Sequence, residues 1–204
     1  MDYFLYGMMI NRIFTFLAFS SLLCMAGTMV DLNGGFERCT ADNNGILTPV
    51  GWNLNRSISK NCSVRATLEK EEVRTGNFSL NFECEEDGVL YFRTLDIFPV
   101  NAGDKVRFRL YVRGGGKFNI MLLMMKGPGL GHTLRNIGGL PERQVADEDK
   151  WTEIVHEITM QPVKSRDNKE AFSKLWFLPM IHIKGEADIF MDDLSIEVIP
   201  SEEK

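Results

Sequence analysis

The sequence predicts an all-β fold in which two antiparallel sheets pack face to face. Short runs of alternating apolar and polar residues follow one another along most of the chain, and Gly, Pro, Asn and Asp separate them. Few segments repeat their apolar residues with the helical period. Such a succession of strands and turns is typical of a β-sandwich and argues against alternating strands and helices.

The candidate strands are Ser63–Glu69, Asn77–Cys84, Val89–Ile97, Lys105–Gly114, Lys117–Met125, Thr152–Met160, Lys174–Gly185 and Asp188–Val198. Turn residues bound each of them, and no repeat or low-complexity linker interrupts the series. This number of strands favours Greek-key connections and a two-sheet jelly roll. Between Gly127 and Asp149 the chain is rich in Gly and Pro, so we expect a long loop that meets any partner.

The alternation is cleanest in Lys105–Gly114, which we expect to bury one face. The inward set is Val106, Phe108, Leu110 and Val112, and the outward set is Arg107, Arg109, Tyr111 and Arg113. On Lys117–Met125 the outward set continues as Asn119 and Met121. Lys174–Gly185 is apolar on both faces; we place Phe177, Pro179, Ile181 and Ile183 inward, and Trp176, Met180 and His182 outward.

The first residues differ from the rest and predict a secretory signal peptide over residues 1–27. Arg12 precedes an apolar run from Ile13 to Met25, and the small residues of Ala26–Thr28 follow. This run is shorter than the roughly 20 residues that span a bilayer, which favours cleavage over a retained anchor. We therefore expect one domain over residues 28–204, secreted, periplasmic or on the cell surface, without a transmembrane span.

Composition narrows the class of ligand. The chain has 204 residues, of which 44% are hydrophobic and 25% charged, and its formal net charge is −5. This is ordinary globular composition, and no run of like charges suits a polyanion. We therefore expect neither nucleic acid nor an anionic membrane surface as a partner, and the acidic balance favours a neutral ligand.

The cysteines that remain after the signal peptide are Cys39, Cys62 and Cys84. In a secreted chain this odd number allows at most one intramolecular disulfide and leaves one thiol. We favour Cys62–Cys84, because the two flank a predicted hairpin centred near Val73, and Cys39–Cys62 stays an alternative. We expect a monomer, with a thiol-linked dimer as the alternative.

The two acids Asp192 and Asp193 stand in the middle of the last candidate strand. A carboxylate taken out of water is costly unless a cation or several hydrogen bonds compensate it. The sequence therefore predicts that another part of the chain supplies such a partner here.

Several segments, taken in order, resemble the calcium-stabilised carbohydrate-binding modules attached to secreted xylanases, glucanases and cellulases. These segments are Leu32–Glu37, Gly51–Trp52, Val73–Glu83, Phe98–Gly114, Lys150–Ile158 and Ile189–Val198. They cover nearly all of the mature chain, and their order gives the resemblance its specificity. The resemblance implies a galactose-binding-like sandwich whose first and last strands lie side by side, with Trp52 and Trp151 in the core.

The resemblance also implies a structural calcium ion between the chain ends. Its ligands are Glu37 and Asp192, with Asp193 second. Calcium takes six to eight oxygens at roughly 2.3 to 2.6 Å, from carboxylates and carbonyls, so one ion can join both ends. The alternative is that both acids cap a turn or make surface hydrogen bonds.

The function that these observations favour is non-catalytic binding of a polysaccharide or oligosaccharide by an exposed sheet face and adjacent loops. Sugars offer apolar C–H faces to aromatic rings and hydroxyls to planar hydrogen-bonding groups. The candidate ligand-binding residues are Tyr91, Arg107, Arg109, Tyr111, Asn119, Trp176 and His182. The competing interpretation is that the arginines are solvated or paired with Glu153 and Glu157.

Two other functions stay open. One is a jelly-roll polysaccharide lyase or hydrolase, in which Arg109, Tyr111 and His182 neutralise a uronate, act as acid or base and abstract a proton. The other is an extracellular protein-interaction or envelope-matrix module, which uses the methionines of Met121–Gly131 as an adaptable contact surface.

Overall fold

A computed structural model describes residues 27–165 and 169–201, and it is almost entirely β-structure. The signal peptide predicted over residues 1–27 lies outside these ranges except for Gly27. The strands are β1 Thr28–Val30, β2 Cys39–Ala41, β3 Leu47–Pro49, β4 Trp52–Leu54, β5 Lys60–Thr67, β6 Ser79–Thr94, β7 Phe98–Asn101, β8 Lys105–Met125, β9 Thr133–Val145, β10 Thr152–Thr159, β11 Val163–Lys164, β12 Ala171–Phe172, β13 Lys174–Lys184 and β14 Ala187–Ile199. One short 3-10 helix, Leu130–His132, precedes β9.

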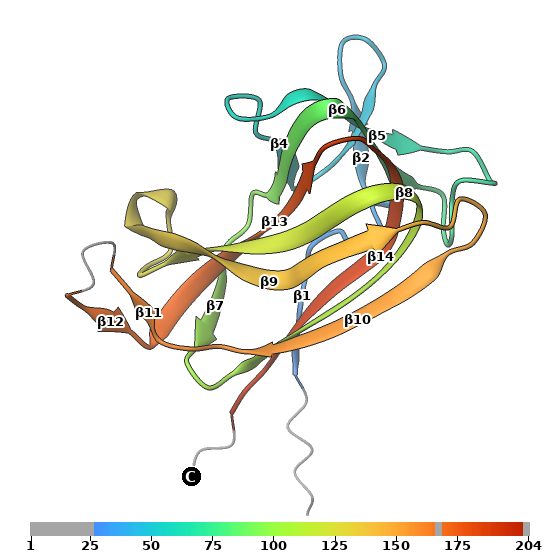
Figure 1. The fold of residues 1–204 in the computed structure, drawn as a ribbon. Coiled ribbons are helices and arrows are strands. Elements are labelled where there is room, and N and C mark those ends of the chain that lie inside the picture. The colour runs from blue at the N-terminus through green and yellow to red at the C-terminus, as the bar shows by residue number, and fades with distance from the viewer. Residues whose placement is uncertain (1–26, 166–168, 202–204) are drawn as a thin grey trace, which may run out of the picture.

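The strands form two layers that share two long members (Figure 1). The first layer contains β5, the first half of β6, β14, the first half of β8, and β10. The second layer contains β4, the second half of β6, β13, the second half of β8, and β9. Every pairing is antiparallel, so the predicted all-β, two-sheet jelly-roll sandwich is confirmed.

The long strands β6 and β8 each replace two predicted strands. The sequence predicts Lys105–Gly114 and Lys117–Met125 as separate strands, with Gly115 and Gly116 between them. In the structure β8 continues through this point, and Gly114 and Gly116 have φ of 111° and 126°. Glycine adopts these dihedrals readily, so the strand bends from one layer to the other without ending.

The prediction of a long loop between Gly127 and Asp149 is wrong, because β9 occupies most of this segment. β9 pairs with β8 through several register shifts. Its buried residues, Leu134, Gly139, Leu140 and Val145, are therefore not spaced by two, which is the spacing that identifies a strand in a sequence.

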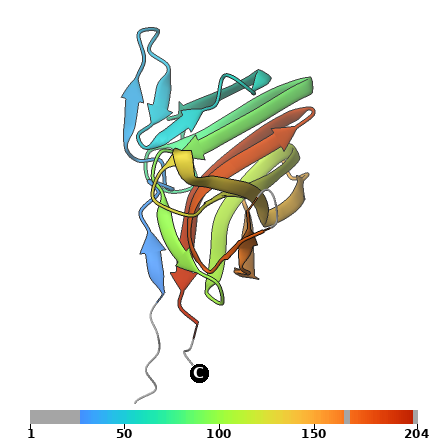
Figure 2. The ribbon, with the colours of Figure 1, turned by 90° about the vertical axis from the view of Figure 1, so that its left-hand side faces the viewer.

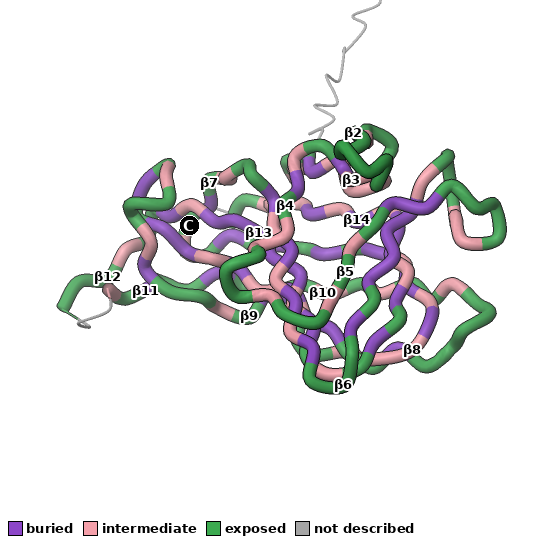
Figure 3. The backbone as a smooth tube through the Cα atoms, turned by 90° about the horizontal axis from the view of Figure 1, so that it is seen from above, coloured by how far each residue is buried: buried purple, intermediate pink, exposed green. Residues whose placement is uncertain are grey.

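The core lies between the layers, and exposed positions gather on the loops (Figure 3). All four predicted inward residues of Lys105–Gly114 are at most 1% exposed. The inward residues predicted for β13 are also buried, but Met180 is 5% exposed on the opposite face. Trp52 belongs to the core, where its indole N–H donates to the carbonyl of Leu32 at 2.7 Å.

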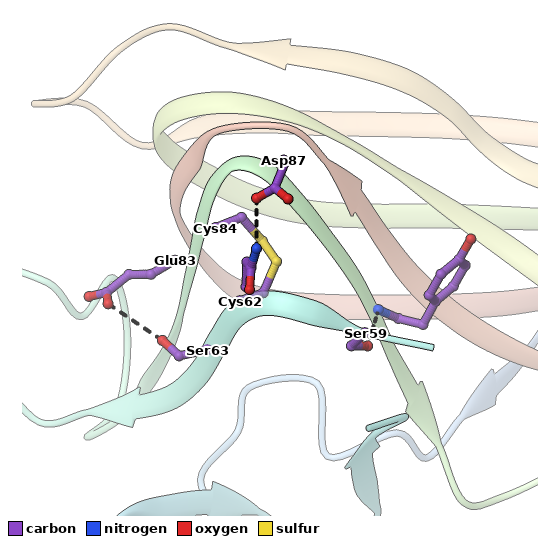
Figure 4. The surroundings of a disulfide bond; sticks show 8 residues. Ser59, Cys62, Ser63, Glu83, Cys84 and Asp87 are labelled. Atoms are coloured by element: carbon purple, nitrogen blue, oxygen red, sulfur yellow. Dashed lines mark hydrogen bonds between the residues drawn. A yellow bond between two sulfur atoms is a disulfide. The ribbon is translucent and has the colours of Figure 1, made fainter. Parts of the chain in front are cut away.

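The predicted disulfide Cys62–Cys84 is present. The two cysteines face each other across β5 and β6, beside the side-chain pair Ser63–Glu83 (Figure 4). Cys39 is the free cysteine of the described residues; it is half-buried, and its thiol donates to the carbonyl of Phe36. A disulfide within the chain fits an oxidising compartment. Among the described residues, no helix is long and apolar enough to cross a membrane.

The first and last strands lie side by side. In β1 and β14, Thr28 stands opposite Val198 and Val30 opposite Ile196. Both described ends of the chain therefore lie on the same side of the molecule (Figures 1 and 2). This is the arrangement that the resemblance implies.

Candidate functional site

Three of the predicted ligand-binding residues meet on the outer face of the second layer. Tyr91 of β6, His182 of β13 and Asn119 of β8 stand directly opposite one another on adjacent strands. The rings of Tyr91 and His182 are 4.6 Å apart between centroids. His182 Nδ1 and Asn119 Oδ1 are 3.2 Å apart. We call these three residues, with Met121 and Met180 beside them, the second-layer surface.

The surroundings of His182 favour its neutral form. Burial lowers its pKa, the charge of Lys184 lowers it further, and Glu142 acts in the opposite direction. An amide oxygen only accepts hydrogen bonds, so His182 Nδ1 donates to Asn119. The other ring nitrogen, Nε2, is then an acceptor for an incoming hydroxyl.

The outer face continues along β13 toward Trp176. His182 lies six positions after Trp176, which corresponds to about 20 Å along a strand. Between them, Leu178 and Met180 are buried although they lie outside the main core. The second-layer surface therefore has a polar, aromatic end at His182, an apolar middle and a half-exposed indole at the far end.

The prediction that all seven residues share one face is wrong. Arg107, Arg109 and Tyr111 do point outward, but they stand on the first half of β8 between β14 and β10. Because β8 bends around the core, residues of the same alternation end on different layers (Figure 1). The structure consequently separates Arg109 and Tyr111 from His182, and the predicted lyase arrangement is not assembled.

The outward residues of the first layer form a network of ion pairs. Arg109 pairs with Glu153, and the hydroxyl of Tyr111 donates to the same carboxylate at 2.9 Å. The Tyr111 hydroxyl and then Arg109 lower the pKa of Glu153. Likewise, Arg107 contacts Glu157 and Glu197, each at 3.0 Å. This is the competing arrangement considered above, in which the arginines are paired.

The predicted meeting of the chain ends occurs at the loop of residues 73–78. Glu37 accepts the backbone N–H of Asn77 at 3.0 Å. Asp192 is fully buried and accepts the backbone N–H groups of Arg74 and Thr75, each at 3.1 Å. Burial raises the pKa of Asp192 to about 6, against the effect of these hydrogen bonds.

A β-bulge places Asp193 in the same cluster. Its φ is 51°, and the register of β14 against β8 shifts between Asp192 and Ser195. Asp193 forms an ion pair with Arg74 and accepts the hydroxyl of Thr75 at 2.8 Å. The guanidinium of Arg74 lies 3.3 Å above the Tyr111 ring centroid.

The carboxylates of this cluster are already occupied by protein groups. The carboxylate oxygens of Glu37, Asp192 and Asp193 are already engaged by N–H groups, a hydroxyl and the guanidinium of Arg74. Across residues 27–165 and 169–201, no group of three or more His, Cys, Asp or Glu is placed to hold a metal ion. Calcium thus stays a prediction of the resemblance, and Arg74 supplies the positive charge in this structure.

Two arrangements escaped the sequence analysis. Arg74 lies within Val73–Glu83, one of the segments that carry the resemblance. The residues around it in the sequence do not indicate a contact with Asp193. Trp151, expected in the core, instead lies beside Arg113 on the outer face. The guanidinium carbon of Arg113 is 5.6 Å from the centroid of the Trp151 ring. Its alternation with the outward residue Glu153 is a signal that places Trp151 outside.

Comparison with known proteins gives the fold. No protein-family model and no curated protein matches the sequence. A cyclase from Fischerella sp. TAU shares 13% identity at a TM-score of 0.55, over 87% of this chain and 100% of that one. The tandem CBM22-1–CBM22-2 domain of Paenibacillus barcinonensis Xyn10C shares 16% at 0.50, over 89% of this chain and 49% of that one.

A further match is the enzymatically active domain of bacteriophage CBA120 tailspike protein 4, at 7% identity and a TM-score of 0.53. The match covers 86% of this chain but only 22% of the tailspike chain. Binding modules and enzymes thus share this architecture, and likenesses at such low identity establish the fold alone. The chain is a jelly-roll sandwich of the kind found in carbohydrate-binding modules.

Proposed function

We propose that the protein is a secreted, non-catalytic module that binds a polysaccharide or oligosaccharide on its second-layer surface. The observation that carries this proposal is the contact of Tyr91, His182 and Asn119 on three adjacent strands. Likeness to a carbohydrate-binding tandem domain supports the same class of ligand.

The chemistry of this surface suits a sugar. The Tyr91 ring offers an apolar face for the C–H side of a sugar ring, and its hydroxyl both donates and accepts. Asn119 has an amide group that donates and accepts in one plane, and His182 Nε2 accepts. Because the three side chains hold one another, little rotamer freedom is lost when a ligand binds.

The test is glycan-array screening followed by calorimetry on the mature chain from Thr28. Tyr91→Ala and Asn119→Ala each remove one partner of the ligand, and we expect each to weaken binding at least about tenfold. The matched control is Arg109→Ala on the first layer, which we expect to bind like wild type. Loss of binding in the control with retention in Tyr91→Ala contradicts the proposal.

The same preparation separates binding from catalysis. Incubation with uronate polymers and neutral polysaccharides, followed by product analysis, measures lyase or hydrolase activity. We expect binding without product. Product that disappears in His182→Gln instead makes the protein an enzyme and overturns the non-catalytic assignment.

A further inference from the structure

A cavity of about 560 Å³ opens on the first layer, away from the second-layer surface. It lies at the bend of β8 and the start of β14. Its floor is the backbone of Gly114–Gly116, and its walls include Glu148, Glu186, Asp188 and Phe190. Asp188 is held in place by the side-chain amide of Asn81, which donates to it at 2.7 Å.

The three positions of this bend are glycine for different structural reasons. A Cβ on Gly114 would lie 2.1 Å from the carbonyl oxygen of Asp188, and one on Gly116 would lie 2.7 Å from the Ala187 Cβ. Close approach of β14 therefore requires both glycines. A Cβ on Gly115 would meet nothing within 4 Å, and its φ is not in the left-handed region. The packing of β14 therefore does not require glycine at position 115, and the absence of a side chain there keeps the cavity open.

An aromatic–arginine–aromatic row meets the cavity at Phe190, the member of the row that lines it. The guanidinium of Arg113 lies 4.7 Å from the Phe190 ring centroid and 5.6 Å from that of Trp151. Unlike Arg107 and Arg109, Arg113 forms no ion pair with any carboxylate in the described ranges, and its buried Nε has no hydrogen-bond partner there. Because Nε is buried, the terminal nitrogens Nη1 and Nη2 of Arg113 are the donors that this row offers to a ligand, beside two rings.

We propose that this cavity and the Arg113 row form a second saccharide site, which takes a neutral sugar residue. Phe190 and Trp151 supply ring faces for stacking, and Arg113 donates to hydroxyl oxygens. The carboxylates of Glu148, Glu186 and Asp188 accept from hydroxyls. Because acids outnumber the single guanidinium at the site, uronic and sulfated sugars are repelled.

The test uses paired glycine variants of the mature chain. Gly115→Leu fills the first-layer cavity. Gly138→Leu is its counterpart, since Gly138 is exposed, stands opposite Met121 on the second-layer surface and also has open space at its Cβ. Calorimetry with neutral β-1,4-linked hexasaccharides of glucose and of xylose measures affinity and the number of sites for each variant.

We expect two sites per wild-type chain and one in Gly115→Leu, with the remaining site lost in the Gly115→Leu/Gly138→Leu pair. Arg113→Ala weakens the first-layer site at least about tenfold, and polygalacturonate does not occupy it. In the Gly138→Leu background, where the second-layer surface beside Trp176 is blocked, the remaining ligand-induced quenching of tryptophan fluorescence is lost in Trp151→Phe, which gives a local readout of the first-layer site.

The two proposals fail separately. Unchanged stoichiometry and affinity in Gly115→Leu and Arg113→Ala overturn the second site and leave the second-layer proposal standing. Binding that survives Gly138→Leu and Tyr91→Ala but vanishes in Gly115→Leu overturns the second-layer proposal and leaves the first-layer site standing. Tight polygalacturonate binding at the Arg113 row contradicts the assignment to neutral sugars.

Discussion

His182 shows how neighbours on other strands determine the state of one side chain. Tyr91 and Asn119 lie far from it in sequence but flank it in the sheet, and burial lowers its pKa. Alternation along β8 and β13 predicts that Asn119 and His182 point outward, while Tyr91 is a candidate only because it is aromatic. Sequence alone was unable to show that β6, β13 and β8 are neighbours, because strand order depends on how the whole chain packs.

The lowered pKa of His182 predicts a pH dependence. The unfolded state binds a proton near pH 6.5 and the folded state only at lower pH, so the stability contributed by neutral His182 is lost as pH falls through that range. An NMR titration of the imidazole, assigned with His182→Gln, should give a pKa below 6.5. A value of 6.5 or above contradicts the burial seen here.

Arg74 is expected to stabilise the junction of the chain ends. Arg74→Ala leaves Asp193, whose side chain is 29% exposed, without its cation, and we expect a loss of about 1–3 kcal/mol in the free energy of unfolding. Chemical denaturation measures it, with Arg38→Ala, a surface pair with Asp31, as a control close to wild type.

Thermal melting of the wild-type chain tests whether calcium binds at this junction. Since Arg74 already balances Asp193, we expect equal melting temperatures with calcium and with chelator. A wild-type melting temperature several degrees lower in chelator would show that an ion binds here and that the resemblance predicted correctly.

At the scale of elements, alternation of period two predicts both halves of the long strands β6 and β8 but does not predict the irregular strand β9. The inward residues of β8 follow strict alternation, while β9 is interrupted by register shifts that a sequence pattern does not reveal. The join between the halves of β8 was missed for a related reason. Glycines at 114–116 indicate a turn unless the neighbouring strand β14 is known to require those at 114 and 116.

The disulfide joins β5 to β6, and we expect it to stabilise the folded chain. It closes a loop with a sequence separation of 22, so the Cys62→Ser/Cys84→Ser variant should lose about 3 kcal/mol of unfolding free energy. Urea denaturation without reductant measures this loss. Cys39→Ser is the control, and a loss of the same size in that variant would show that the effect is not due to the bridge.

At the scale of the whole molecule, we expect a monomer. Burial, with a contribution from Glu37, raises the pKa of the Cys39 thiol, so little thiolate is present at neutral pH to form a bridge between chains. Size-exclusion chromatography without reductant should give one monomeric species. A covalent dimer that Cys39→Ser abolishes would support the alternative in which chains are linked through this thiol.

The pairing of β1 with β14 also determines how the domain responds to mechanical load. Thr28 and Val198 are opposite each other at the same end of an antiparallel pair. A force that separates these two positions pulls across the strands, so it breaks the backbone hydrogen bonds one after another, as a zipper opens, and never loads them together in shear. Tethered at these positions, the sandwich yields first where β1 leaves β14, while β14 keeps its pairing with β6 and β8 beside the proposed first-layer site.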